Sequence, residues 1–184
     1  MEDISLYVLD LVQNSIAANA RIITIEVMEY TEENLLTLTI IDDGNGMDEF
    51  LISKVTNPFF TTRTTRKVGL GLPMAKASTE GCGGSFTINS SKGIGTKVTM
   101  IYKTGHIDCP PFGRMDQTMT TLVAANTNTD FTYKHSTQKG TFNFDTRVIK
   151  SELKEVPIDT FEVLEWICSY VKEGINEIDG GKMS

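Results

Sequence analysis

Apolar residues recur at helical spacing over the first segment of the chain, at Ile4, Val8, Leu11, Val12 and Ile16. Positions three and four apart share one face of a helix, so this pattern predicts an amphipathic helix over residues 4–20. Asp10 and Asn14 are four residues apart. We therefore expect both side chains on one face of that helix, where they would meet the same object.

Four later segments are rich in β-branched residues and predict strands. They are residues 22–29, 35–41, 85–90 and 97–103. Polar segments at residues 31–34 and 92–95 join them in pairs, which predicts two antiparallel hairpins. Asp42 then ends the second strand.

Between the hairpins the pattern predicts two helices and a loop. Residues 47–55 predict a short helix, and Pro73 suits the first turn of a helix over residues 73–80, because its missing N–H would be unpaired there anyway. Residues 56–68 are polar, rich in threonine and basic, without periodicity, and predict a mobile loop. Two hairpins and three helices therefore predict an α/β sandwich.

The chain changes character at residue 104, which predicts a domain over residues 1–103 and a C-terminal extension of unknown role over residues 104–184. The extension contains a predicted helix over residues 115–125 and a predicted hairpin of residues 131–135 and 141–145. An apolar stripe at helical spacing follows, with Trp166 beside it. The stripe consists of Phe161, Leu164, Ile167, Tyr170, Val171 and Ile175. It would pack on the hairpin or dock another protein, and the sequence leaves both open.

Composition narrows the class of protein. A chain of 184 residues with 40% hydrophobic content supports one main core. Its formal charge of −7 argues against a nucleic-acid partner. Three cysteines without a C-x-x-C pair suit a reducing compartment. No apolar run approaches the roughly 20 residues of a membrane span, and the first residues are acidic, unlike a signal peptide. We expect a soluble, cytoplasmic protein without a membrane partner.

Asp42, Gly44 and Gly46 together suggest a site for a flat ring. The carboxylate at the strand end is an acceptor for an adenine amine, and glycine backbone can approach a ring closely because no Cβ intervenes. The simpler interpretation is a turn after a strand, since Asp and Gly dominate turns. The chain contains no G-x-x-x-x-G-K-[ST] run, and neither of its glycine pairs continues as a dinucleotide-binding motif does.

A second glycine pair precedes the helix predicted near residue 73. Gly69 and Gly71 could let backbone N–H groups and the positive helix end hold a phosphate chain, or could serve only as a hinge. Arg63, Arg66 and Lys67 could close over the same phosphates, or could only solvate an exposed loop.

The helix face of Asp10 and Asn14 offers candidate metal chemistry. The carbonyl oxygen of Asn14 suits Mg²⁺ that already carries water and phosphate oxygens. Asp10, one turn earlier, could orient an attacking water or hold a water on the metal, and is the tentative catalytic residue. Without other motifs, two such residues on a helix are more often simply solvated.

Five short motifs in one order resemble the GHKL superfamily, the ATP-binding domains of gyrase B, heat-shock chaperones, MutL and sensor histidine kinases. The motifs are Asp10…Asn14, Asp42-x-Gly-x-Gly46, residues 58–62 (Pro-Phe-Phe-Thr-Thr), residues 69–72 (Gly-Leu-Gly-Leu) and residues 83–96 (Gly-Gly…Gly-x-Gly-Thr). The resemblance covers about residues 1–103. The chain is also similar to stand-alone bacterial ATP-binding proteins. It implies an α+β fold of the Bergerat type, a two-layer sandwich whose mixed, mostly antiparallel sheet is covered by helices on one face.

The resemblance also implies roles for individual residues. Asn14 takes the Mg²⁺ role, Asp42 the adenine role, Gly69 and Gly71 flank a lid, and Thr96 approaches the adenine side. The full set expected to bind ATP or ADP is Asn14, Asp42, Gly44, Gly46, Met47, Phe60, Arg63, Lys67, Gly69, Leu70, Gly71, Leu72 and Thr96.

The expected function takes account of two departures of this chain from the family pattern. Asp10 stands where the hydrolysing branches carry glutamate, and misplacing a catalytic group by about 1 Å can cost roughly a hundredfold in rate. His106 and His135 do not lie in a kinase acceptor motif. We therefore expect an ATP-Mg²⁺-binding, kinase-like regulatory module without its own phosphoacceptor domain, which acts on a partner protein. The alternatives are an ATP-gated interaction switch and a slow, MutL-like ATPase.

Overall fold

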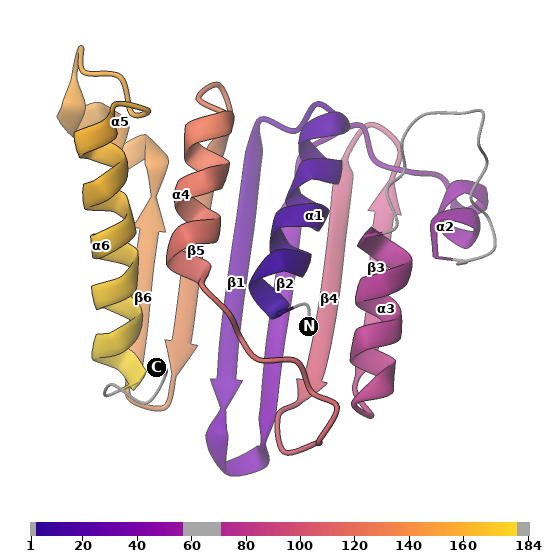
Figure 1. Ribbon diagram of the computed structural model, residues 1–184. Coiled ribbons are helices and arrows are strands. Elements are labelled where there is room, and N and C mark those ends of the chain that lie inside the picture. Colours follow the sequence, from indigo (N-terminus) through magenta and orange to yellow (C-terminus); the bar gives the residue numbers. More distant parts are fainter. Residues whose placement is uncertain (1–2, 57–70, 180–184) are drawn as a thin grey trace.

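The architecture is one six-stranded sheet with helices packed on one face (Figure 1), in a computed structural model that describes residues 3–56 and 71–179. The strands are β1 (Ile22–Tyr30), β2 (Leu35–Asp42), β3 (Ser85–Ser91), β4 (Gly95–Lys103), β5 (Asp130–Thr137) and β6 (Gly140–Asp145). Their order across the sheet is β3-β4-β2-β1-β5-β6. Every neighbouring pair is antiparallel except β1 and β5, which are parallel. The expected α+β sandwich with a mixed, mostly antiparallel sheet is thus confirmed.

The helices are α1 (Ile4–Ala17), α2 (Glu49–Val55), α3 (Gly71–Gly81), α4 (Met115–Ala125), α5 (Thr146–Leu153) and α6 (Phe161–Asp179). Asp3 caps α1, since its carboxylate accepts a hydrogen bond from the backbone N–H of Leu6 at 3.0 Å. Asp48 caps α2 in the same way through the N–H of Leu51 at 2.8 Å, which is why α2 begins at Glu49 instead of residue 47. None of the described helices is long and apolar enough to cross a membrane.

The core lies between the sheet and the helices. Alternate residues of β1, Ile23, Ile25 and Val27, are fully buried, whereas the residues between them are half-buried. Val8 and Val12 of α1 are fully buried as well. This period of two in the strand and of four in the helix is what the sequence pattern predicted.

Most predicted elements match the observed ones. Both hairpins, the helix over residues 115–125 and the hairpin of the C-terminal extension are present, whereas α5 was not predicted. The first helix ends at Ala17, three residues before the predicted residue 20, because the chain turns there into β1. The predicted loop at 56–68 lies outside the described residues except for Thr56, which caps α2 at its C-terminal end.

The apolar stripe of α6 packs on the hairpin, one of the two possibilities that the sequence left open, and docking to another protein stays a prediction. Ile167 and Val171 are buried, and α6 packs on β6 so closely that Gly174 lies against the ring of Phe142. Phe161, however, is 69% exposed. Packing on the hairpin therefore accounts for one side of the stripe.

The C-terminal hairpin is part of the main sheet. Ile22 of β1 pairs with Asp130 of β5, and the register continues to Met28 and Ser136. A strap at residues 104–114 connects β4 to α4. Its carbonyl oxygens accept hydrogen bonds from the first turn of α1, where the N–H of Ile4 donates to the oxygen of Pro111 at 2.9 Å. The sequence pattern gave no indication of the parallel pairing.

Candidate functional site

A cavity of about 560 Å³ opens where α1, α2 and the start of α3 meet the ends of β2 and β4. One wall is apolar and includes Leu51, Val55, Ile88 and Val98. The polar residues of the cavity are few and come from different elements, among them Asn14, Asp42 and Thr96. A mostly apolar hollow with a few polar groups is typical of a small-molecule site.

Asp42 is the buried carboxylate of this cavity. It is 9% exposed, and β2 ends with it directly opposite Thr96 of β4. Ser15 Oγ donates a hydrogen bond to Oδ2 at 2.7 Å, and the N–H of Gly44 donates to Oδ1 at 2.9 Å. A carboxylate has about four acceptor sites. The described donors therefore hold Asp42 in one orientation and leave acceptor capacity for a ligand.

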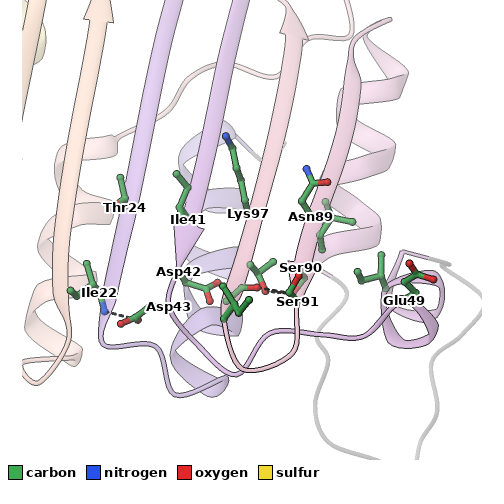
Figure 2. A pocket seen from close by; sticks show the side chains of 15 residues that line it. Ile22, Thr24, Ile41, Asp42, Asp43, Glu49, Asn89, Ser90, Ser91 and Lys97 are labelled. Carbon is green, nitrogen blue, oxygen red and sulfur yellow. Dashed lines mark hydrogen bonds between the residues drawn. The ribbon is translucent and has the colours of Figure 1, made fainter.

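The neighbouring Asp43 has a different role. Figure 2 shows it beside the start of β1, where Oδ1 accepts hydrogen bonds from the N–H groups of Arg21 at 2.7 Å and Ile22 at 2.9 Å. Partial burial raises the pKa of Asp43, but the hydrogen bonds from these N–H groups lower the pKa by more than burial raises it. The pKa of Asp43 therefore lies below its ordinary value. Asp43 thus fixes the start of a strand and does not line the 560 Å³ cavity. Together with Asp42 it lines the separate, neighbouring pocket drawn in Figure 2.

The glycine loop after Asp42 is clamped on two sides. The N–H of Asn45 donates to the oxygen of Ala18 at 2.8 Å, and the N–H of Gly93 donates to the oxygen of Asn45 at 2.7 Å. Gly46 has φ +63, and a Cβ there would lie 2.0 Å from the carbonyl oxygen of Ser91. Only glycine fits this position. Its backbone consequently forms part of the cavity wall.

Ser90 lies beside the cavity and contacts two residues that line it, Met47 and Thr96. Its Oγ accepts a hydrogen bond from the N–H of Met47 at 2.7 Å and lies 2.9 Å from Thr96 Oγ1. Figure 2 shows Ser90 near Asp42, on the strand next to β4. Met47 and Thr96 are thereby held on one network.

Asp10 and Asn14 lie one turn apart on α1, as predicted, and face the start of α3. A Cβ on Gly71 would lie 3.2 Å from Asp10 Cβ and 3.7 Å from Asn14 Nδ2, so the first residue of α3 packs directly on this pair. Asn14 Nδ2 is buried and has no hydrogen-bond partner within residues 3–56 and 71–179. A buried polar atom without a partner costs about 1–3 kcal/mol. A ligand that supplied a partner would remove this cost.

The structure brings together six of the residues expected to bind nucleotide. The cavity is lined by Asn14, Asp42, Gly46, Met47, Leu72 and Thr96. Gly44 and Gly71 support it through the contacts given above. Asp10 is exposed beside the start of α3. The roles assigned to Phe60, Arg63, Arg66, Lys67, Gly69 and Leu70 remain predictions, because these residues lie outside the described ranges.

Sequence reasoning missed Ser15, which orients Asp42. A usable signal exists in the sequence, because Ser15 stands four residues after Leu11, a member of the apolar stripe of the first helix. A small polar residue on an apolar helical stripe calls for a buried partner. The apolar wall from α2 was also missed, since a short helix gives little periodicity to read.

Comparisons with known proteins match this geometry. Residues 2–106 match the family model described as "Histidine kinase-, DNA gyrase B-, and HSP90-like ATPase". The chain is 32% identical over 98 residues to the sensor histidine kinase YvrG of Bacillus subtilis, which covers 51% of this chain and 17% of that protein. It is 40% identical over 58 residues to the sensor protein kinase FleS of Pseudomonas aeruginosa, covering 32% of this chain and 14% of that protein. The chain thus spans only a small part of these relatives.

A likeness among solved structures extends further along the chain. The crystal structure of the N-terminal domain of a DNA repair protein superposes with a TM-score of 0.52 at 16% identity, covering 79% of this chain and 52% of that one. The 79% of this chain that superposes exceeds the part matched by the family model, residues 2–106. The likeness therefore supports the fold beyond residue 106.

Proposed function

Because the chain belongs to the family of histidine kinase-, DNA gyrase B- and HSP90-like ATPases, we propose that it binds ATP with Mg²⁺ and passes the γ-phosphoryl group to a partner protein. The observation that carries the nucleotide part is Asp42, a buried carboxylate held by Ser15 and Gly44 with acceptor capacity left over.

The cavity suits adenine better than guanine. The exocyclic amine of adenine is a donor and can bind Asp42, whereas guanine presents a carbonyl oxygen at the matching ring position. Apolar side chains such as Ile88 and Val98 provide surface for the faces of the base. We therefore expect ATP to be preferred over GTP.

The phosphate chain would extend from this site toward the start of α3. The N-terminus of a helix favours phosphate, because free N–H groups and the helix dipole both attract negative charge. The unpaired amide nitrogen of Asn14 could donate a hydrogen bond to a phosphate oxygen, and its carbonyl oxygen would hold Mg²⁺. When bound, the ion would supply positive charge that balances the negative charge of the phosphate oxygens. Asp10, on the same helix face, is the candidate base for an acceptor hydroxyl, imidazole or water.

The two histidines of the chain support an acceptor on another protein. His135 is fully buried and hydrogen-bonded on both ring nitrogens, so no phosphoryl group can reach it. His106 follows β4, whereas Thr96 of the cavity stands at the other end of that strand. At about 3.3 Å per residue of strand, His106 and Thr96 are separated by more than about 20 Å, so His106 lies far from the cavity.

The test uses γ-labelled ATP with Mg²⁺ and native extract of the source organism. Wild-type protein is expected to label a second protein, and Asp42→Asn should not. Asp43→Asn serves as the matched control and should label like wild type, because Asp43 lies outside the cavity.

The other possible outcomes point to different functions. Phosphate release without labelled protein would replace transfer by slow hydrolysis of the MutL type. Partner capture that depends on ATP but leaves no label would indicate an ATP-gated interaction switch. Failure to bind ATP at all would refute the proposal.

A further inference from the structure

Three ionisable side chains converge at the end of the sheet opposite the nucleotide cavity. They are Glu29 near the end of β1, His135 on β5 and Asp179 at the end of α6, and one ligand atom from each lies within 4.8 Å of the others. β1 and β2 are antiparallel, with Ile23 opposite Asp42 and Glu29 opposite Leu36. The cluster therefore lies roughly 20 Å from Asp42, at about 3.3 Å per residue. Figure 1 shows the end of α6 beside the lower ends of β5 and β6.

The imidazole of His135 is held in one orientation. Its Nδ1 lies 2.7 Å from the hydroxyl of Tyr133, and its Nε2 lies 2.6 Å from Glu29 Oε1. The ring is completely buried, and the Glu29 side chain is only 12% exposed. Nε2 is thus presented to the carboxylates with no rotation needed.

One oxygen of the Asp179 carboxylate has no hydrogen-bond partner among residues 3–56 and 71–179. This oxygen, Oδ2, is buried. Thr137 Oγ1 and Lys139 Nζ do reach this end of α6, but they bind the backbone oxygens of Ile178 at 2.8 Å and Asp179 at 2.9 Å. Within the part of the chain that the structure describes, Oδ2 of Asp179 therefore remains unpaired.

This environment is unfavourable for a second negative charge and favourable for a cation. A buried anion without a donor is costly, and the C-terminus of a helix adds partial negative charge. A bound cation would pair both carboxylates at once.

We propose that Glu29, His135 and Asp179 form a binding site for a divalent metal ion of the zinc class, separate from the nucleotide site. One imidazole nitrogen with two carboxylate oxygens is a donor set that zinc accepts, whereas Mg²⁺ prefers oxygen alone. The hydroxyl of Tyr133 on Nδ1 is the outer hydrogen bond that orients a ligating histidine. A solvent molecule would complete four-coordination.

Metal binding requires one local rearrangement. Ligand atoms about 2.0–2.1 Å from a tetrahedral zinc ion stand roughly 3.3 Å apart, so Glu29 must move from its 2.6 Å hydrogen bond to His135. The proton between Nε2 and Oε1 leaves to solvent as the metal takes its place. The ion would then fasten the end of α6 to β1 and β5.

Cobalt(II) is the probe, because its visible spectrum reports the ligands. Protein stripped with chelator and free of nucleotide should bind one Co²⁺ per chain in a four-coordinate spectrum without thiolate charge-transfer bands, and Zn²⁺ should displace it. Asp179→Asn, nearly identical in shape, should weaken binding at least tenfold. Glu177→Gln on the exposed side of the same helix is the matched control and should bind like wild type.

Two results would overturn the site. One is Co²⁺ affinity unchanged in both Asp179→Asn and Glu29→Gln, each shown to be folded by circular dichroism. The other is a spectrum dominated by thiolate bands, which would place the ion on the cysteines. Neither measurement depends on ATP, so the outcome is independent of the nucleotide proposal.

Discussion

Replacing Asp42 by asparagine separates the ligand-binding role of this carboxylate from its role in the fold. The amide oxygen of Asn can keep the hydrogen bond from the N–H of Gly44, and the amide nitrogen would then face Ser15 Oγ. A serine hydroxyl accepts as well as donates, and its proton can turn to the carbonyl oxygen of Leu11, 3.4 Å away. Both buried partners stay paired. We therefore expect the free energy of unfolding to change by about 1 kcal/mol or less.

The affinity for nucleotide should fall by more than the free energy of unfolding does. The adenine amine loses a charged acceptor, and hydrogen bonds to charged groups contribute about 1.5–3 kcal/mol. Since about 1.4 kcal/mol corresponds to a factor of ten, the dissociation constant of ATP-Mg²⁺ should rise about 10- to 140-fold. The preference for ATP over GTP should shrink with it.

Isothermal titration calorimetry at fixed Mg²⁺, with thermal unfolding of the same samples, measures both quantities. Asp43→Asn is the control, because its amide oxygen can still accept from the N–H groups of Arg21 and Ile22 outside the cavity. An ATP affinity of Asp42→Asn within about twofold of wild type, or an equal loss in both variants, would refute the assignment of adenine to Asp42.

Three further predictions concern other parts of the structure. Asn14→Ala should weaken ATP binding and remove most of its dependence on Mg²⁺ in calorimetry, whereas an unchanged dependence would exclude Asn14 as a ligand. Gly174→Ala should lower the free energy of unfolding by about 1–3 kcal/mol in urea titrations, because the new methyl group would lie 2.1 Å from a phenyl ring; Gly81→Ala, with open space around it, should change little, and equal effects would contradict this. Burial raises the pKa of Asp116, but Arg114 lowers it below its ordinary value, so this pair stabilises the fold above about pH 4 and less as pH falls through the lowered pKa. Arg114→Gln should lower the free energy of unfolding at pH 7 and lower it less at pH 3, and a loss independent of pH would oppose this.

The parts of the fold that could be predicted depend on local sequence. The helix α4 follows from spacing alone and was predicted over the residues that the structure shows. The hairpins follow from two runs of β-branched residues with a polar turn between them. In each case the interacting residues are near one another in sequence.

The parallel pairing of β1 and β5 could not be predicted in this way. Thr24 and Thr132 meet across it at 2.8 Å although they stand 108 residues apart in the chain. The sequence of a strand does not identify the strand with which it pairs, and its periodicity indicates only which face is buried. The cluster around His135 was missed for the same reason, because its members come from three distant segments.

The candidate site was predicted in part because its motifs are short and ordered. Asn14, Asp42 and Thr96 are distant in sequence, yet the resemblance to a family supplied their common location, and the cavity contains all three. Ser15 escaped because its role rests on one hydrogen bond to a residue on another element.

The pairing of β1 with β5 also determines how this protein can be divided and in what order it can fold. A chain ending near residue 106, where the family match stops, would leave residues 22–28 of β1 without their partners on one side. An unpaired, apolar strand edge invites addition of a strand from another molecule. During synthesis that edge stays open until β5 has left the ribosome, so we expect the nucleotide site to assemble late, after more than two thirds of the chain has been made.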